Sequence, residues 1–320
     1  MRILFITATR VGDAVLSTGL LSHLIGHYPN ARYTIAAGPA ALSLFEAVPN
    51  VEELIAMEKS GLERHWFDLW RRCVGTRWDI VVDLRRSAIA WLLFADKRYR
   101  VPKLDGAIHR IELLGATLGQ RDDPPSPTLW TNARHQEAAK RLFPAGSPVL
   151  AFAPAANWRG KQWRAERFAD LAVRLTGTEG PLPGARIAVF ASAHERQQAA
   201  PVLSALPADR VIDTIGKIDL PTVAACLRHC ALFIGNDSGL MHMAAACEVP
   251  TLGLFGPSRN EHYAPWGRHT ATIRTPESFD ELTGAPDYDH RTTDTLMDGL
   301  SIEQVETAAR SLWTQCGRAA

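Results

Sequence analysis

The sequence predicts an α/β protein with two parallel sheets, and three observations carry that prediction. Short apolar runs alternate with helix-like segments along the chain, which is the pattern of βαβ units. The pattern is interrupted at residues 144–148, where two prolines stand close together, and then starts again. A chain of 320 residues is also long enough for about two domains. We therefore expect two α/β domains, residues 1–146 and 147–320, with a cleft between them.

In the first half, each expected strand is a short apolar run that leads into a turn and a helical pattern. The chain opens with such a run at Arg2–Ala8, and a helix follows from Ala14 to about His27. Pro29 stops that helix. The other expected elements of this half are strands at 32–37, 51–56 and 78–83 and helices at 40–47, 61–74 and 132–142.

The second half repeats the order of strand, loop and helix. Gly177 is expected to end one of its helices, and Ser301 to cap the last one. The segment 280–294 is expected to be a long polar loop. The expected strands are 149–153, 186–191, 210–213, 231–235, 251–255 and 270–274, and the expected helices are 165–175, 193–206, 221–229, 240–247 and 302–313.

Charge and cysteine content exclude some classes of protein. The formal net charge of +1 gives no overall field that favours nucleic acid. Residues 1–146 carry +4 and the remainder −3, which fits ordinary variation or a first half that meets an acidic substrate or an anionic membrane surface. Five cysteines in this length indicate a reducing compartment. With no apolar run near 20 residues and no room for a signal peptide, we expect a cytoplasmic protein, attached at most to a membrane surface.

The most informative stretch runs from residue 233 to 257. An apolar strand breaks on a polar loop, a short apolar helix follows, and a second strand comes directly after it. Ser238 stands where an N-cap belongs, and the free N–H groups at the helix start are suited to a phosphate. The alternative is that the loop merely caps a helix. The candidate phosphate site comprises Asp237, Ser238, Gly239, Leu240 and His242.

A second candidate lies in the loop after the first strand, which carries Arg10, Gly12 and Asp13. This loop lacks the G-x-G-x-x-G fingerprint, which disfavours an NAD or FAD protein. Asp13 stands near a helix start, so it is either a helix N-cap or a functional carboxylate. A carboxylate that faces a phosphate leaving group across a cleft suits a general base acting on a hydroxyl. Asp13 is therefore the candidate catalytic residue.

Basic side chains supply the remaining candidates. Lys161 follows the first strand of the second half, where its charge suits a diphosphate or is simply solvated. Asn157 lies in the same loop, and Trp163 beside it is expected to pack. Arg85 and Arg86 follow the carboxyl end of a strand and either belong to a solvated face or bind an acidic acceptor. No D-x-D triplet stands in a site-like context, so no metal is expected.

Taken together, these motifs make the chain resemble glycosyltransferase family 9, the ADP-heptose:lipopolysaccharide heptosyltransferases. The resemblance runs nearly from end to end. The matching segments are Val11-Gly12-Asp13, Tyr28-Pro29-Asn30-Ala31, Val48-Pro49-Asn50-Val51, Trp78-Asp79-Ile80-Val81-Val82-Asp83-Leu84, Lys161-Gln162-Trp163, Glu166-Arg167-Phe168, Asp237-Ser238-Gly239-Leu240-Met241-His242, Pro250-Thr251 and Leu254-Phe255-Gly256-Pro257.

The resemblance implies a GT-B fold of two Rossmann-like domains, whose last helix can pack on the first domain. It implies inverting, metal-independent transfer of heptose from ADP-heptose to an anionic inner-core acceptor, with no cofactor and with possible peripheral contact with the inner membrane. Asp13 would be the general base, and Lys161 would bind the donor diphosphate. The acceptor contacts would be Arg10, Gly12, Arg85 and Arg86, and the remaining donor contacts Asn157, Asp237, Ser238, Gly239, Leu240 and His242.

One departure from the family pattern bears on the donor. Ala155 and Ala156 stand where family members often carry small hydroxylated residues near the phosphates. Other nucleotide sugars therefore stay open as donors. Two different functions also stay open, namely a nucleotide-sugar epimerase of the same fold and a binding module without turnover. The presence of Asp13 disfavours the binding module, and the lack of an evident second acid/base pair near Asp13 disfavours the epimerase. No oligomeric state is predicted.

Overall fold

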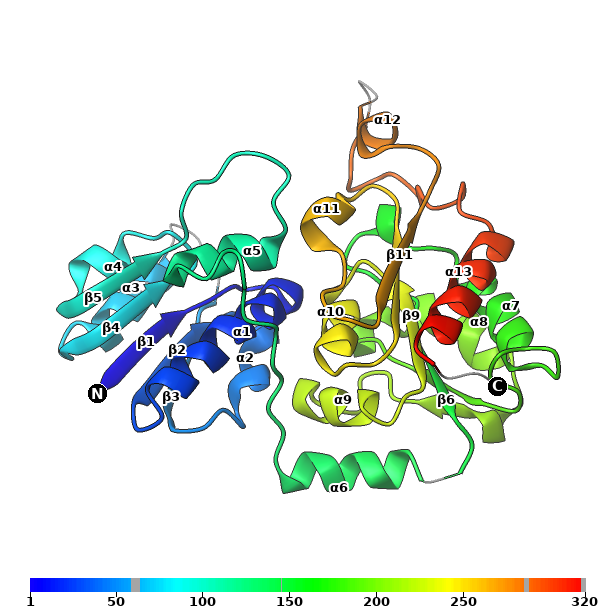
Figure 1. Ribbon diagram of the computed structural model, residues 1–320, viewed down its shortest axis with the longest axis horizontal. Coiled ribbons are helices and arrows are strands. Elements are labelled where there is room, and N and C mark those ends of the chain that lie inside the picture. Colours follow the sequence, from blue (N-terminus) through cyan, green and yellow to red (C-terminus); the bar gives the residue numbers. More distant parts are fainter. Residues whose placement is uncertain (59–63, 145, 285–287, 318–320) are drawn as a thin grey trace. The chain divides into compact units, whose positions relative to one another are not determined.

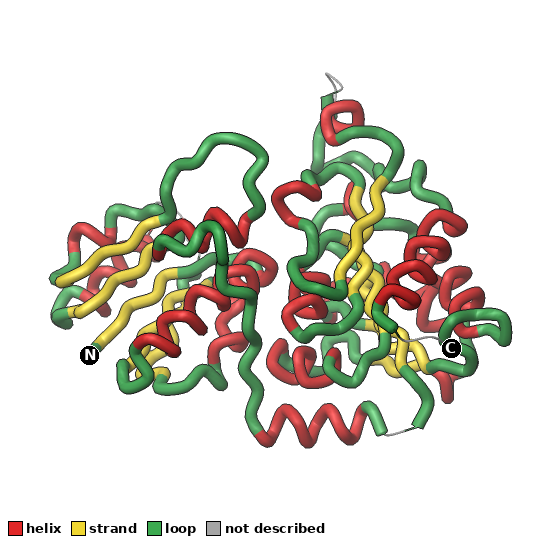
Figure 2. Tube along the Cα trace, in the orientation of Figure 1, coloured by secondary structure: helices red, strands yellow, loops and turns green. Residues whose placement is uncertain are grey.

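A computed structural model describes residues 1–58, 64–144, 146–284 and 288–317. The chain divides into two compact units, Met1–Asn132 and Ala133–Ala320. Each unit is a parallel β-sheet with helices on both faces (Figures 1 and 2). The prediction of two α/β domains with parallel sheets is therefore confirmed.

The first unit holds a five-stranded sheet in the order β3-β2-β1-β4-β5, with every neighbouring pair parallel. This is the order of a doubly wound sheet. The strands are β1 (Arg2–Ile6), β2 (Arg32–Ala37), β3 (Val51–Ala56), β4 (Trp78–Asp83) and β5 (Ala95–Arg100). The helices are α1 (Val11–His27), α2 (Pro39–Leu42), α3 (Arg64–Cys73), α4 (Ile89–Leu92) and α5 (Arg110–Gly115), with 3₁₀ turns η1 (Ser43–Phe45) and η3 (Ala116–Leu118).

Alternation along the central strand divides the core of this unit into two layers. Leu4 and Ile6 of β1 belong to a cluster that also contains Leu69 of α3 and Ile89 of α4. Because successive side chains of a strand point to opposite faces, Ile3 and Phe5 face the other layer. Both sets are fully buried, and α5 packs on α1.

The second unit holds a six-stranded parallel sheet in the order β11-β10-β9-β6-β7-β8. The strands are β6 (Val149–Ala153), β7 (Arg186–Val189), β8 (Val211–Asp213), β9 (Leu232–Asn236), β10 (Thr251–Phe255) and β11 (Thr270–Arg274). The helices are α6 (Ala133–Leu142), α7 (Ala165–Thr176), α8 (Arg196–Ser204), α9 (Leu220–Leu227), α10 (Gly239–Ala246), α11 (Asn260–Tyr263), α12 (Phe279–Thr283) and α13 (Ile302–Gln315), with 3₁₀ turns η4 (Arg159–Lys161), η5 (Ala193–Glu195) and η6 (Ala208–Arg210).

Helices α6 and α13 form the two ends of the second unit. Helix α6 packs along α9, so the compact unit begins at Ala133, ahead of the residue 147 expected for the domain start. The last helix, α13, packs on α7 and on strands β10 and β11. Its N-terminus is capped by Ser301 as predicted, because the Ser301 hydroxyl accepts a hydrogen bond from the N–H of Gln304.

The elements themselves were largely predictable. Five expected strands have the predicted bounds (β2, β3, β4, β6 and β10), and so does β11 at the edge of the second sheet. Strand β5 was not among the expected strands, because its Asp-Lys-Arg sequence lacks the apolar run that marks a buried strand. It is an edge strand, where charged side chains are usual. The expected helix 61–74 begins at Arg64 in the structure, and residues 61–63 lie outside the described part.

None of the helices in the described part of the chain has both the length and the apolar character that a membrane span requires. The cysteines are free, and burial raises the pKa of Cys73 and of Cys226 to about 12. Cys73, Cys226 and Cys230 are buried core side chains, whereas Cys247 and Cys316 are partly exposed.

Candidate active site

Asp13 lies in the first turn of α1, directly after the loop that follows β1. The N-cap of α1 is Arg10, so the alternative of Asp13 as N-cap is wrong. Three residues inside the helix, Asp13 still gains from the partial positive charge of the helix start. Its side chain is 25% exposed. The candidate general base is thus fixed on a rigid helix yet open to a reacting group.

Arg110 is a neighbour of Asp13 that the sequence did not reveal. Its Nε atom lies 3.8 Å from an Asp13 carboxylate oxygen. The same Nε is buried and makes no hydrogen bond to any described residue. Arg110 opens α5, which packs on α1, so a contact between two helices brings together residues that are far apart in the chain.

The loop after β4 is organised by the buried carboxylate of Asp83. This side chain accepts hydrogen bonds from the Arg85 backbone N–H and from the Ser87 hydroxyl, both at 2.9 Å. Burial raises the pKa of Asp83, and these hydrogen bonds and the nearby Arg100 act in the opposite direction. Arg86 has a positive φ of 55°, which is uncommon for a residue other than glycine.

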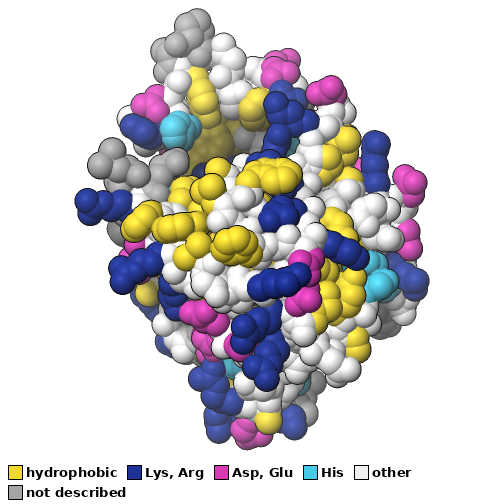
Figure 3. Space-filling model, turned by 90° about the vertical axis from the view of Figure 1, so that its left-hand side faces the viewer, with side chains coloured by type: hydrophobic (Ala, Val, Ile, Leu, Met, Phe, Trp, Pro, Cys, Tyr) yellow, Lys and Arg dark blue, Asp and Glu magenta, His cyan; other side chains and the backbone are white. Residues whose placement is uncertain are grey.

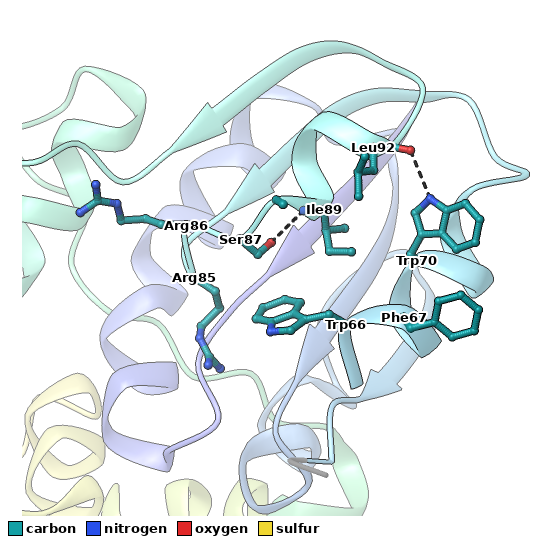
Figure 4. A pocket seen from close by; sticks show the side chains of 9 residues that line it. Trp66, Phe67, Trp70, Arg85, Arg86, Ser87, Ile89 and Leu92 are labelled. Carbon is teal, nitrogen blue, oxygen red and sulfur yellow. Dashed lines mark hydrogen bonds between the residues drawn. The ribbon is translucent and has the colours of Figure 1, made fainter. Parts of the chain in front are cut away.

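Arg85 and Arg86 line a pocket of about 590 Å³ within the first unit. Figure 4 shows Arg85 beside the ring of Trp66, while Arg86 extends away from it. The Arg85 guanidinium lies 5.5 Å from the centre of the Trp66 ring, and its Nη1 atom is buried without a hydrogen-bond partner among the described residues. Strand β4 lies beside β1, with Asp83 opposite Ile6, so the Arg85 loop and the Asp13 loop leave the same edge of the sheet.

In the second unit, Lys161 is the last residue of the 3₁₀ turn η4, and several contacts fix that turn. Gly160 lies under the Trp158 ring, where a Cβ atom would come within 2.7 Å of the ring. The N–H of Leu296 donates to the Gly160 carbonyl at 3.0 Å. Trp163 is 1% exposed, so the expectation that it packs is confirmed.

Lys161 and Asp237 form a close ion pair, with Lys161 Nζ 2.6 Å from Asp237 Oδ2. The Lys161 side chain is 23% exposed and that of Asp237 only 7%. Asn236, the residue before Asp237, is fully buried and ties the same loops together. It accepts from the Trp163 backbone N–H at 3.1 Å and donates to the Pro154 carbonyl at 2.7 Å.

Helix α10 begins beside this pair, and no side chain caps it. Ser238 is its N-cap residue, as predicted, with extended backbone angles. The Ser238 hydroxyl makes no capping bond and is buried without a partner among the described residues. His242, one turn into the helix, is buried. The start of α10 thus has no side-chain cap, and its N-cap hydroxyl, which has no partner in the described part of the chain, is next to the Asp237 that pairs with Lys161.

The structure therefore brings the predicted residues into two groups, each within one unit. Asn157 is exposed in the loop ahead of η4. The sequence assigned no role to the end of the polar loop or to the residues that follow it, yet Asp294 and Leu296 both contact the Lys161 turn. Arg159 Nε donates to Asp294 at 2.9 Å and Arg164 Nε donates to Asp298 at 2.7 Å. The hydrogen bond from Arg164 lowers the pKa of Asp298.

Two parallel-sheet units in doubly wound order are the architecture of the GT-B class of glycosyltransferases, and the second unit carries an uncapped helix start beside a lysine. Residues 71–283 match the model of glycosyltransferase family 9 (heptosyltransferase). This match spans more than half of the chain, and the protein belongs to that family. The matched part includes Lys161 and the Asp237 loop and leaves out Asp13.

Individual relatives agree with this assignment. Lipopolysaccharide heptosyltransferase 2 of Salmonella typhimurium is 26% identical over 311 residues, which cover 86% of this chain and 88% of the relative. Among solved structures, a family 9 glycosyl transferase from Veillonella parvula has a TM-score of 0.81 at 24% identity, over 98% of this chain and 97% of the other. The E. coli ADP-heptose lps heptosyltransferase II has a TM-score of 0.75 at 21% identity, over 99% and 100%.

Proposed function

We propose that the protein is an inverting heptosyltransferase that moves a heptose from ADP-heptose to an inner-core lipopolysaccharide acceptor without a metal ion. The observation that carries the proposal is the Lys161–Asp237 pair beside the uncapped start of α10. A lysine ammonium has three N–H donors, and the bond to Asp237 uses one of them. The other two are available to a diphosphate, together with the buried hydroxyl of Ser238.

The leaving group sets the main electrostatic demand of this reaction. As the bond between the sugar C1 and the phosphate oxygen breaks, negative charge grows on the ADP diphosphate. Lys161 and the backbone N–H groups of Gly239 and Leu240 would stabilise that charge, and such donors each contribute about 10²–10³-fold to a rate. In this proposal Asp237 keeps Lys161 in place, and His242 and Asn157 contact the donor.

Asp13 would act on the other reactant. An acceptor hydroxyl attacks C1, its proton passes to the Asp13 carboxylate, and ADP departs from the opposite face of the sugar ring. A single displacement of this kind inverts the configuration at C1. The position of Asp13 on α1, with a quarter of its side chain exposed, suits a base that must meet a bulky hydroxyl.

The acceptor is proposed to contact the first unit. Arg10 and Gly12 adjoin Asp13, and Arg85 and Arg86 line the pocket that follows β4 at the same sheet edge. Guanidinium groups suit the anionic groups of a lipopolysaccharide core. This acceptor would place the reaction at the cytoplasmic face of the inner membrane.

A second donor remains a specific candidate because of Ala155 and Ala156. Both are 4% exposed and contribute no hydroxyl to the loop before η4. A donor that relies on hydroxyl contacts at this point would lose them here. Transfer from a nucleotide sugar other than ADP-heptose is therefore the alternative to be tested in parallel.

The test is ADP release from the purified protein supplied with ADP-heptose and a deacylated core acceptor. We expect release that needs the acceptor, persists in EDTA, and falls by about 10²–10⁴-fold in Asp13→Asn. Asp170→Asn, an exposed carboxylate on α7, is the matched control and should keep full activity. Binding of ADP-heptose without any turnover would instead indicate a binding module. Release only with another nucleotide sugar would replace the donor.

A further inference from the structure

Gln162, which stands between Lys161 and Trp163, is a polar side chain in the interior of the second unit. It is only 3% exposed. Polar and charged side chains mostly lie at the surface of a protein, and Figure 3 shows many Lys, Arg, Asp and Glu side chains on one face of this molecule. Burial of an amide is costly unless its polar atoms are hydrogen-bonded, so the partners of Gln162 indicate what it does.

Both polar atoms of the Gln162 side chain are hydrogen-bonded. Its Nε2 donates to the Ala156 carbonyl at 2.7 Å and to Gln198 Oε1 at 2.8 Å. Its Oε1 accepts from Arg159 Nη1 at 3.1 Å. The backbone carbonyl of the same residue accepts from the Thr295 hydroxyl. Gln162 therefore joins the loop after β6, the turn η4, helix α8 and the segment after the polar loop.

A second buried amide, that of Asn236, holds the two ends of the same loop. It donates to the Pro154 carbonyl at 2.7 Å and accepts from the Trp163 N–H at 3.1 Å. Gln162 holds the loop between these two points. Residues 154–163, here called the clamped loop, are thus kept in one backbone path by two buried side chains.

The hydrogen bond to Ala156 also sets the direction of a backbone N–H group. The peptide bond between Ala156 and Asn157 is trans, and in a trans peptide unit the C=O and the N–H point to opposite sides. Gln162 holds the Ala156 carbonyl in the interior. The N–H of Asn157 is therefore turned to the other side of the loop, where Asn157 itself is exposed.

We propose that Gln162 is a positioning residue, which aims the backbone N–H of Asn157 at the diphosphate of the donor. This inference rests on the proposed function and deepens it, because Gln162 itself does not touch the donor. Ala155 and Ala156 give the clamped loop no hydroxyl for the phosphates, so a backbone N–H is the donor group that this part of the loop offers. An N–H that is already in place needs no reorganisation when negative charge grows on the leaving group.

The experiment is calorimetric titration of the full chain and of Gln162→Met with ADP and with adenosine. Methionine has a similar length and adds no charge, but it cannot donate to the Ala156 carbonyl. We expect the Kd for ADP to rise by about tenfold or more, because one hydrogen bond to a charged group is lost. The Kd for adenosine, which has no diphosphate, should stay within about twofold. Gln197→Met, an exposed residue on α8, is the matched control and should bind ADP like the unaltered chain.

Asn157→Pro is a second variant that removes the same contact without touching the interior, because proline has no backbone N–H. It should raise the Kd for ADP by a similar factor. The double variant with Gln162→Met should bind ADP no more weakly than either single variant, since both changes remove one hydrogen bond. Circular dichroism should confirm the fold of each protein.

Three results would overturn the inference and leave the proposed function standing. They are an unchanged Kd for ADP in Gln162→Met, an equal loss of ADP and adenosine binding in that variant, and additive losses in the double variant. The second of these would assign Gln162 a structural role only. If the unaltered chain itself binds no ADP, the proposed donor is wrong, and the inference is overturned with it.

Discussion

Replacement of Lys161 by Gln separates what this lysine does for the fold from what it does for the reaction. Lys161 Nζ lies 2.6 Å from the nearly buried carboxylate of Asp237. Without the lysine, that carboxylate stays out of water with no countercharge. The substitution should therefore weaken both the second unit and the charge stabilisation of the leaving diphosphate.

The two effects have different expected sizes. Breaking a buried ion pair costs about 3–5 kcal/mol, and the partial exposure of Lys161 argues for about 3 kcal/mol here. For a unit of this length, that loss lowers the unfolding midpoint by about 6–12 °C. Loss of one donor that stabilises growing negative charge should lower kcat by about 10²–10³-fold.

A double variant distinguishes the two roles. Lys161→Gln with Asp237→Asn removes both charges and leaves two side chains that can hydrogen-bond, so most of the lost stability should return. The turnover number should stay low, because the diphosphate still lacks its cation. Thermal unfolding and ADP release measure the two quantities on the same preparations.

The matched control is Lys217→Gln, whose partner Asp213 lies at 2.8 Å on the surface of the same unit. This exposed pair should contribute less than about 1 kcal/mol and leave turnover unchanged. The assignment of Lys161 to the diphosphate is refuted if the double variant regains the turnover of the unaltered protein. It is equally refuted if Lys161→Gln alone keeps turnover within about threefold.

Three further variants test other parts of the two sites. Arg110→Gln should lower the acceptor-dependent kcat, because Arg110 adjoins Asp13 in the first unit. ADP binding should stay constant, because the proposed ADP contacts lie in the second unit, and weaker ADP binding would contradict this. Arg85→Ala with Arg86→Ala should raise the acceptor KM by at least about tenfold, which steady-state kinetics would show, and an unchanged KM would remove both from the acceptor site. Asp83→Asn concerns pH. Burial raises the folded-state pKa of Asp83, so the folded state takes up its proton more readily than the unfolded state. The unaltered protein should therefore lose stability relative to Asp83→Asn as pH rises from about 4 through that raised pKa. The measurement is the unfolding midpoint of both proteins at acidic and at neutral pH. If the difference between the unaltered protein and Asp83→Asn is the same at both pH values, the reasoning is wrong.

Most of the fold could be predicted because local patterns decide it. Buried parallel strands read as short apolar runs, and β2, β4 and β6 have the predicted bounds. The strand that the sequence did not predict, β5, depends on its position in the sheet. The charged residues of β5 form a strand only because β4 offers a free edge, with Val82 opposite Tyr99. The short helix α5 carries too little periodicity to be recognised.

In the candidate site, the sequence likewise identified single residues but not the contacts between them. The sequence marked Lys161 and Asp237 separately, since each follows an apolar strand. Their ion pair depends on β6 lying next to β9, with Ala153 opposite Gly235. No local sequence pattern determines which strands are neighbours in a sheet. Arg110 could not be found at all, because only the packing of α5 on α1 brings it to Asp13.

Strand order also explains why the candidate residues gather where they do. In the first sheet the order reverses between β1 and β4, and in the second between β6 and β9. Helices leave such neighbouring strands toward opposite faces, so a crevice forms at their carboxyl ends where ligands bind. Asp13 follows β1 and Arg85 follows β4. Lys161 and Asp237 follow β6 and β9 in the same way. Each unit thus places its candidate residues at its own switch point, which an incidental helix cap or a solvated basic surface would have no reason to do.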